Sequence, residues 1–142
     1  MGLFGNFKFK RKSDAYGILQ KYFARYAPLH GINIDPKRDA YELVENACHA
    51  SPDLLGTKLH RVTFSAAVVT YGMDNCFENG ALDEARFFLH CLGQILIDIE
   101  SDFHRFGLSE NDIRVINNCS DIYKEFAQRL ARISHDRINK NG

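Results

Sequence analysis

Apolar residues recur at helical spacing over two long segments in the middle of the chain. Between residues 54 and 78 they alternate at steps of four and three, which places them on one face of an α-helix: Leu55, Leu59, Val62, Ala66, Val69, Met73 and Cys76. Between residues 82 and 106 a second face holds Ala85, Phe88, Leu89, Leu92, Ile95, Leu96, Ile99, Phe103 and Phe106. Because Asn79 and Gly80 form a turn signal between them, the pattern predicts an antiparallel hairpin with the two faces in contact.

Both predicted helices also carry aromatic and apolar residues on the opposite side, where an exposed helix normally places charge. We call these sets the back stripes: His60, Phe64, Ala67 and Tyr71 on the first helix, and Phe87, His90, Gln94 and Ile97 on the second. A helix that is apolar all round is usually buried. Two interpretations follow: the chain's own other helices cover the back stripes, or a partner protein or cofactor does.

Three more helices are predicted around the hairpin. The first starts at the N-cap residue Ser13 and ends near Tyr26, and the second starts at Asp35 and Pro36 and ends near Ala50. The last starts at Ser109, with Asp112 three residues later as a variant of the capping box, and ends near Ile138. Its expected inward residues are Ile113, Ile116, Cys119, Tyr123, Phe126, Leu130 and Ile133.

The expected fold is therefore an all-α, single-domain bundle of five helices around a long central antiparallel hairpin. A break near Gly56 would raise the number to six. Residues 13–142 form the predicted helical domain, and residues 1–12, MGLFGNFKFKRK, are predicted to be a flexible basic and aromatic tail. The stretch NGALDEARFFLHCLGQIL is similar to the loop and second helix of a tetratricopeptide unit. No further unit follows at the period of about 34 residues, so this resemblance covers one hairpin and assigns no family.

Composition narrows the classes of function. Eighteen basic and eighteen acidic side chains give a formal net charge of zero, which disfavours a specific nucleic-acid partner. The four cysteines are widely spaced, as expected for small core residues in a reducing compartment. No apolar run reaches the roughly 18 residues that span a bilayer, and no signal peptide is recognisable. We therefore expect a cytoplasmic protein.

Histidine and glutamate residues offer one candidate metal site. If the hairpin turns at Asn79 and Gly80, His60 lies nearly level with Glu100, and His104 follows Glu100 by one helical turn. Imidazole nitrogen and carboxylate oxygen suit zinc or iron. A Glu and a His four residues apart are also a common surface hydrogen-bonded pair, so metal binding by His60, Glu100 and His104 is the alternative and no cofactor is the main expectation.

Catalytic motifs are not recognisable in the sequence. Cys48 precedes His49 and His90 precedes Cys91, but neighbours on a helix point about 100° apart and do not form a nucleophile–base pair. Neither of the familiar glycine-rich phosphate loops occurs. We therefore expect a protein without catalytic activity.

These observations favour a small helical protein–protein interaction module, such as an adaptor, inhibitor or regulatory subunit. Its partner would be another protein or a second copy of this chain. Aromatic side chains beside polar ones are typical of interface hot spots, so the expected contact residues are Phe64, Tyr71, Phe87, His90, Gln94 and Ile97. Two alternatives are a bundle that binds a metal or small ligand, and a peripheral membrane protein that uses residues 1–12 at the membrane surface.

Overall fold

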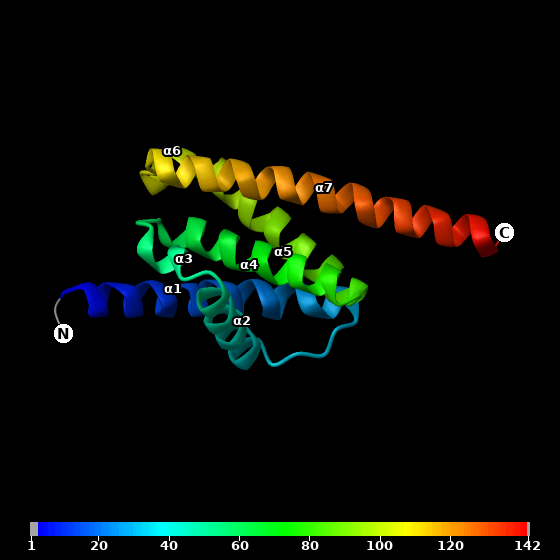
Figure 1. Ribbon diagram of the computed structural model, residues 1–142, viewed down its shortest axis with the longest axis horizontal. Helices are drawn as coiled ribbons and strands as arrows, with labels where there is room; N and C mark the ends of the chain where they lie inside the picture. The colour runs from blue at the N-terminus through cyan, green and yellow to red at the C-terminus, as the bar shows by residue number, and fades with distance from the viewer. Residues whose placement is uncertain (1–2, 142) are drawn as a thin grey trace.

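The structure is a computed structural model that describes the backbone of residues 3–141 and the side chains of residues 11–103, 105 and 107–134. Five long helices make up most of the described chain, and no strand occurs in it (Figure 1). They are α1 (Leu3–Tyr26), α2 (Pro36–Ala50), α4 (Arg61–Glu78), α5 (Leu82–Ser101) and α7 (Glu110–Asn141). Three short helices join them: η1 (Ala27–His30), α3 (Asp53–Gly56) and α6 (Phe103–Phe106). The predicted all-α bundle is confirmed.

The hairpin of α4 and α5 lies at the centre of the fold. These two helices form the most extensive helix pairing of the described chain. The helices α1 and α2 pack on one side of the hairpin and α7 packs on the other (Figure 1). The deepest core residues come from this sandwich, with Phe23, Phe64, Met73, Leu92 and Ile95 each at most 1% exposed. The chain's own helices therefore cover most of the hairpin.

The helix predicted over residues 54–78 is broken in two. It ends at Gly56, and α4 begins only at Arg61, so the expected break near Gly56 is confirmed. Leu55 and Leu59 consequently lie outside α4, although Leu59 is still buried at 6% exposed. His60 caps the new helix start, because its Nδ1 accepts the Val62 N–H at 3.2 Å. The turn to α5 then uses Gly80 at φ 73°, a conformation that suits glycine.

Two predicted helix boundaries, one start and one end, are wrong. The first helix begins at Leu3 rather than at Ser13, so residues 3–12 are part of α1 and not a separate tail. Lysine and arginine are good helix formers, and no proline interrupts this segment, so the helix extends through the apparent cap at Ser13. The helix predicted to reach Phe106 ends instead at Ser101, where serine and aspartate favour a break. A short helix, α6, then leads to Gly107 at φ 60°.

Residue Ile113 was predicted to face the core from α7, and this prediction is wrong. Its side chain is 37% exposed, whereas the preceding residue, Asp112, is only 4% exposed. Farther along α7 the expected pattern holds, with Cys119, Phe126 and Leu130 buried. The Phe126 ring stacks on Phe77 of α4 with centroids 4.5 Å apart. Polar contacts rather than hydrophobic burial therefore determine how α7 begins.

Gly93 of α5 lies close to the Tyr123 ring of α7, and this contact yields a stability prediction. A Cβ atom at Gly93 would lie 3.0 Å from the Tyr123 ring, so Gly93→Leu should lower the free energy of unfolding by about 1–3 kcal/mol through overpacking. The matched control is Gly17→Leu in α1, where nothing lies within 4 Å and the better helix former should be neutral or stabilising. Urea denaturation of both variants checks this, and equal stability losses would contradict it.

Candidate interaction site

The two phenylalanines expected at a partner interface are buried inside the chain. Phe64 is 0% exposed and Phe87 is 2% exposed. The Phe87 ring packs against Phe23 of α1 with centroids 5.3 Å apart and against Phe88 at 5.2 Å. Neither side chain has surface left for a partner. Their predicted role in binding is therefore wrong, and the chain's own helices cover this part of the back stripes.

His90 is also engaged within the chain. Its Nδ1 lies 2.8 Å from Nε2 of His30 at the end of η1, and its ring packs on Tyr26 of α1 with centroids 4.4 Å apart. No local sequence pattern links His30 to His90, because sixty residues separate them. Of the back stripe on α5, Gln94 is half-buried and Ile97 is 54% exposed. In this stripe Phe87 is therefore buried, His90 and Gln94 are half-buried, and Ile97 is exposed.

Tyr71 lines a surface hollow of about 350 Å³. The lining residues come from the α3 region, α4 and α7: Ser51, Asp53, Leu54, Thr57, Leu59, Ala67, Tyr71 and Val115. We call this feature the Tyr71 hollow. Five of these eight side chains are apolar or aromatic, and two of them, Ala67 and Tyr71, belong to the back stripe of α4. It lies where the end of α2 and the α3 region meet α4 and α7.

The six predicted contact residues therefore do not form one surface. Phe64 and Phe87 lie in the core, and His90 packs against α1 and η1. Tyr71 faces the hollow beside α7. The hollow itself was not predicted, since Leu54 and Val115 are separated by about half of the chain and only the fold brings them together.

The candidate metal ligands are not arranged as the sequence suggested. Glu100 and His104 do not share a helix, because α5 ends at Ser101 and His104 belongs to α6. Glu100 is exposed, and the side chain of His104 lies outside the described residues. His60 uses its Nδ1 to cap α4. Within the part of the chain that the structure describes, no three His, Cys, Asp or Glu side chains are placed to hold a metal ion.

Asp112, which is itself buried, is the centre of a polar cluster at the start of α7. Its carboxylate accepts the backbone N–H of His60 at 2.8 Å and both the N–H and the hydroxyl of Ser109 at 2.9 Å. Burial alone would raise the pKa of Asp112, but these hydrogen bonds outweigh it and hold the pKa below its ordinary value. The predicted capping pair of Ser109 and Asp112 is thus confirmed, with an added link to α4.

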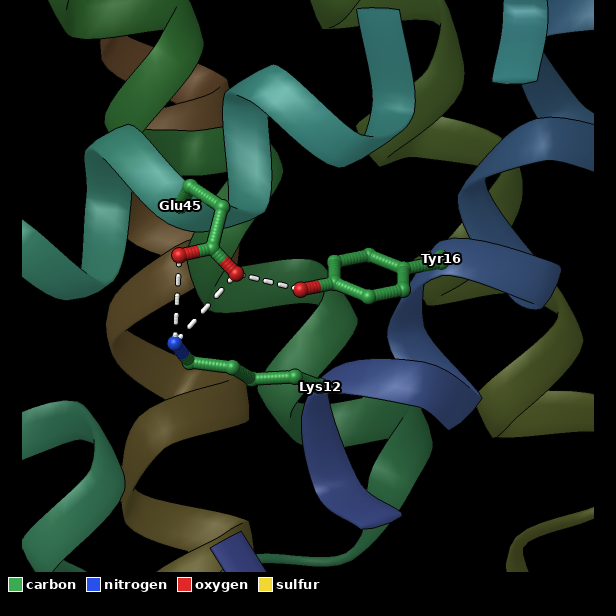
Figure 2. Close-up of polar contacts among 3 residues, drawn as sticks. All are labelled: Lys12, Tyr16 and Glu45. Atoms are coloured by element: carbon green, nitrogen blue, oxygen red, sulfur yellow. Dashed lines mark hydrogen bonds and ion pairs between the residues drawn. The ribbon is translucent and has the colours of Figure 1, made fainter. Parts of the chain in front are cut away.

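Two basic residues of the segment predicted to be a flexible tail make contacts inside the domain. Lys12 pairs with Glu45 of α2 at 3.2 Å, and Tyr16 donates its hydroxyl to the same carboxylate (Figure 2). The Tyr16 hydrogen bond is the main reason why the pKa of Glu45 is lowered, and Lys12 adds to it. Arg11 is 5% exposed and donates to the Thr57 carbonyl. These two cations connect α1 to α2 and to the α3–α4 loop.

The cysteines lie in surroundings that keep them as thiols. Burial raises the pKa of Cys91 to about 12, and burial with the nearby Glu84 raises that of Cys76 to about 11. Burial also raises the pKa of Cys48 and Cys119. Since the thiolate is the nucleophile, these environments are the opposite of an activated cysteine.

Comparison of the chain with protein-family models, with curated proteins and with solved structures finds no match. Within residues 3–141, none of the helices combines the length and the apolar character needed to cross a bilayer.

Proposed function

We propose that this chain is a small protein–protein interaction module without catalytic activity, working in the cytosol, and that the Tyr71 hollow is its contact site. The partner places an apolar side chain in the hollow, and it is either another protein or a second copy of this chain. The observation that carries the proposal is the hollow itself: a concave, largely apolar surface around a half-buried tyrosine. Tyrosine is among the commonest hot-spot residues of interfaces.

The chemistry of the described residues supports binding rather than catalysis. The hollow is lined by one carboxylate, two hydroxyls and otherwise by apolar or aromatic groups, so it offers a partner packing surface with few polar anchors. The cysteines are held as protonated thiols, which are poor nucleophiles. The site therefore resembles a docking surface more than a reaction centre.

A photocrosslinking experiment tests the hollow as a contact site. Tyr71 is replaced by the photoreactive residue benzoylphenylalanine, and the protein is irradiated in the cells of its source organism. We expect one discrete crosslinked species from position 71, of twice 16.2 kDa for a second copy or of another defined mass for a different protein. The matched control places the same residue at Tyr41, which is 52% exposed on α2 and does not line the Tyr71 hollow.

A second variant separates a docked partner from a chance collision. Ala67→Glu introduces a charge into the apolar hollow and should abolish the crosslink from position 71. Circular dichroism must show that this variant keeps its helix content. Identical crosslinked species from positions 71 and 41, or a crosslink that survives Ala67→Glu, would contradict the proposal.

A further inference from the structure

Two imidazoles meet where the short helix η1 touches α5. Nε2 of His30 and Nδ1 of His90 are 2.8 Å apart, a hydrogen-bond distance, and the two rings are nearly perpendicular at 72°. A neutral imidazole has one N–H donor and one acceptor nitrogen, so this contact requires an unprotonated nitrogen on one of the two rings. Once both rings are protonated, both facing nitrogens carry hydrogen and the contact becomes repulsive.

The charged groups around the pair oppose a second proton. Arg86 lies one helical turn before His90 on α5, and its guanidinium contacts Asp83 at 3.2 Å and Ser134 of α7 at 3.4 Å. From α1, Tyr26 packs on His90 and Arg25 lies over the Tyr26 ring at 5.5 Å. Among the described residues, neither imidazole is hydrogen-bonded to a carboxylate. Burial, His90 and Arg86 together lower the pKa of His30 below its ordinary value of 6.5.

The surroundings of the two imidazoles favour a hydrogen bond between them over a shared metal ion. The structure places no third His, Cys, Asp or Glu side chain around the pair within the described part of the chain. The Arg86 guanidinium would repel a divalent cation as it repels a proton. The pair is therefore best understood through its hydrogen bond.

We propose that the His30–His90 contact is an acid-sensitive latch, which holds η1 and the loop of residues 31–35 against α5 at neutral pH and releases them when both imidazoles are protonated. Release would uncover Tyr26 and Phe87, which are 7% and 2% exposed with the latch closed. The neighbouring Leu29 is already 70% exposed. Acid would thus enlarge one apolar surface of the molecule without unfolding the helix bundle.

The direction of the pH effect follows from the lowered pKa of His30. A group that binds its proton less readily in the folded state stabilises that state above its ordinary pKa, and this stabilisation is lost as the pH falls toward the folded value. The latch should therefore open on acidification and close again on neutralisation.

Hydrogen–deuterium exchange of the intact protein between about pH 7.5 and about pH 5 tests the latch. After correction for intrinsic exchange rates, the amides of Gly31 and Ile32, which bond back to η1, should exchange about tenfold faster at the acidic end, the size expected for one lost hydrogen bond. Amides in the middle of α4 should not change. Exchange of η1 that is independent of pH would overturn the proposal.

Two variants and a control make the test specific. Glutamine cannot take up a proton in this range, so His30→Gln and, separately, His90→Gln should remove the pH dependence of exchange at η1. His49→Gln changes an exposed histidine on α2 and should preserve it. His60, whose pKa is also lowered by burial, affects the start of α4, and this is why the readout must be local to η1. Unchanged pH dependence in both glutamine variants would rule out the latch.

Discussion

Replacing Phe87 by alanine is expected to lower the free energy of unfolding by about 3–5 kcal/mol. The side chain is 2% exposed and packs against Phe23 and Phe88, so truncation leaves a cavity between α1 and α5. A domain of this size is stable by only about 5–15 kcal/mol, so the loss is a large part of the total. Urea denaturation followed by circular dichroism measures it.

The control for this prediction is Ile97→Ala on the same helix. Ile97 is 54% exposed, and its truncation should change stability by less than about 0.5 kcal/mol. Both residues belong to the back stripe of α5, so the pair distinguishes a core position from a surface position with similar sequence context. If Phe87→Ala were as mild as Ile97→Ala, Phe87 would not be part of the core, and an interface role would have to be reconsidered.

Phe87 and Ile97 also show what hydrophobic periodicity can and cannot predict about the fold. The pattern predicted the α4–α5 hairpin because that signal depends only on residues within each helix. The same pattern also indicated that the back stripes are packed against something. The pattern could not identify the packing partner, because this depends on where α1 and α7 lie. Their positions follow from contacts across the whole chain. The central helices were thus predictable, whereas the division of their surface between core and exterior was not.

Polar contacts between distant segments account for the other differences. The sequence favoured Ile113 as an inward residue because isoleucine is apolar, but Asp112 is buried instead, satisfied by the His60 amide fifty-two residues away. Ser13 has the form of a helix cap, yet α1 runs through it, and the neighbouring Arg11 contacts Thr57 on the α3–α4 loop. The His30–His90 pair has no local signal at all. Such contacts are a property of the fold rather than of any short pattern.

Replacing Asp112 by alanine should be about as damaging as losing a core aromatic, with an expected cost of about 3 kcal/mol or more. The carboxylate is 4% exposed and accepts from His60 and Ser109. Its removal leaves the backbone N–H groups of His60 and Ser109, whose contacts with Asp112 are partly buried, without this acceptor, and a buried donor without an acceptor costs about 1–3 kcal/mol. It also removes the negative charge that favours the buried Arg11 guanidinium. The start of α7 should fray first, because Asp112 is what connects it to α4.

The pH dependence of stability separates the charge of Asp112 from its shape. Its pKa is lower in the folded protein than the ordinary value of 3.8, so its stabilisation is present above that value and is lost as the pH falls through the folded pKa. Asp112→Asn should therefore have a clearly lower free energy of unfolding than the unsubstituted protein near pH 7. This difference in free energy should become smaller near pH 3. Asp121→Asn, an exposed substitution on the same helix, should stay within about 0.5 kcal/mol at both pH values. A gap of constant size for Asp112→Asn would mean that the hydrogen-bond geometry, and not the ionised carboxylate, stabilises the junction between α4 and α7.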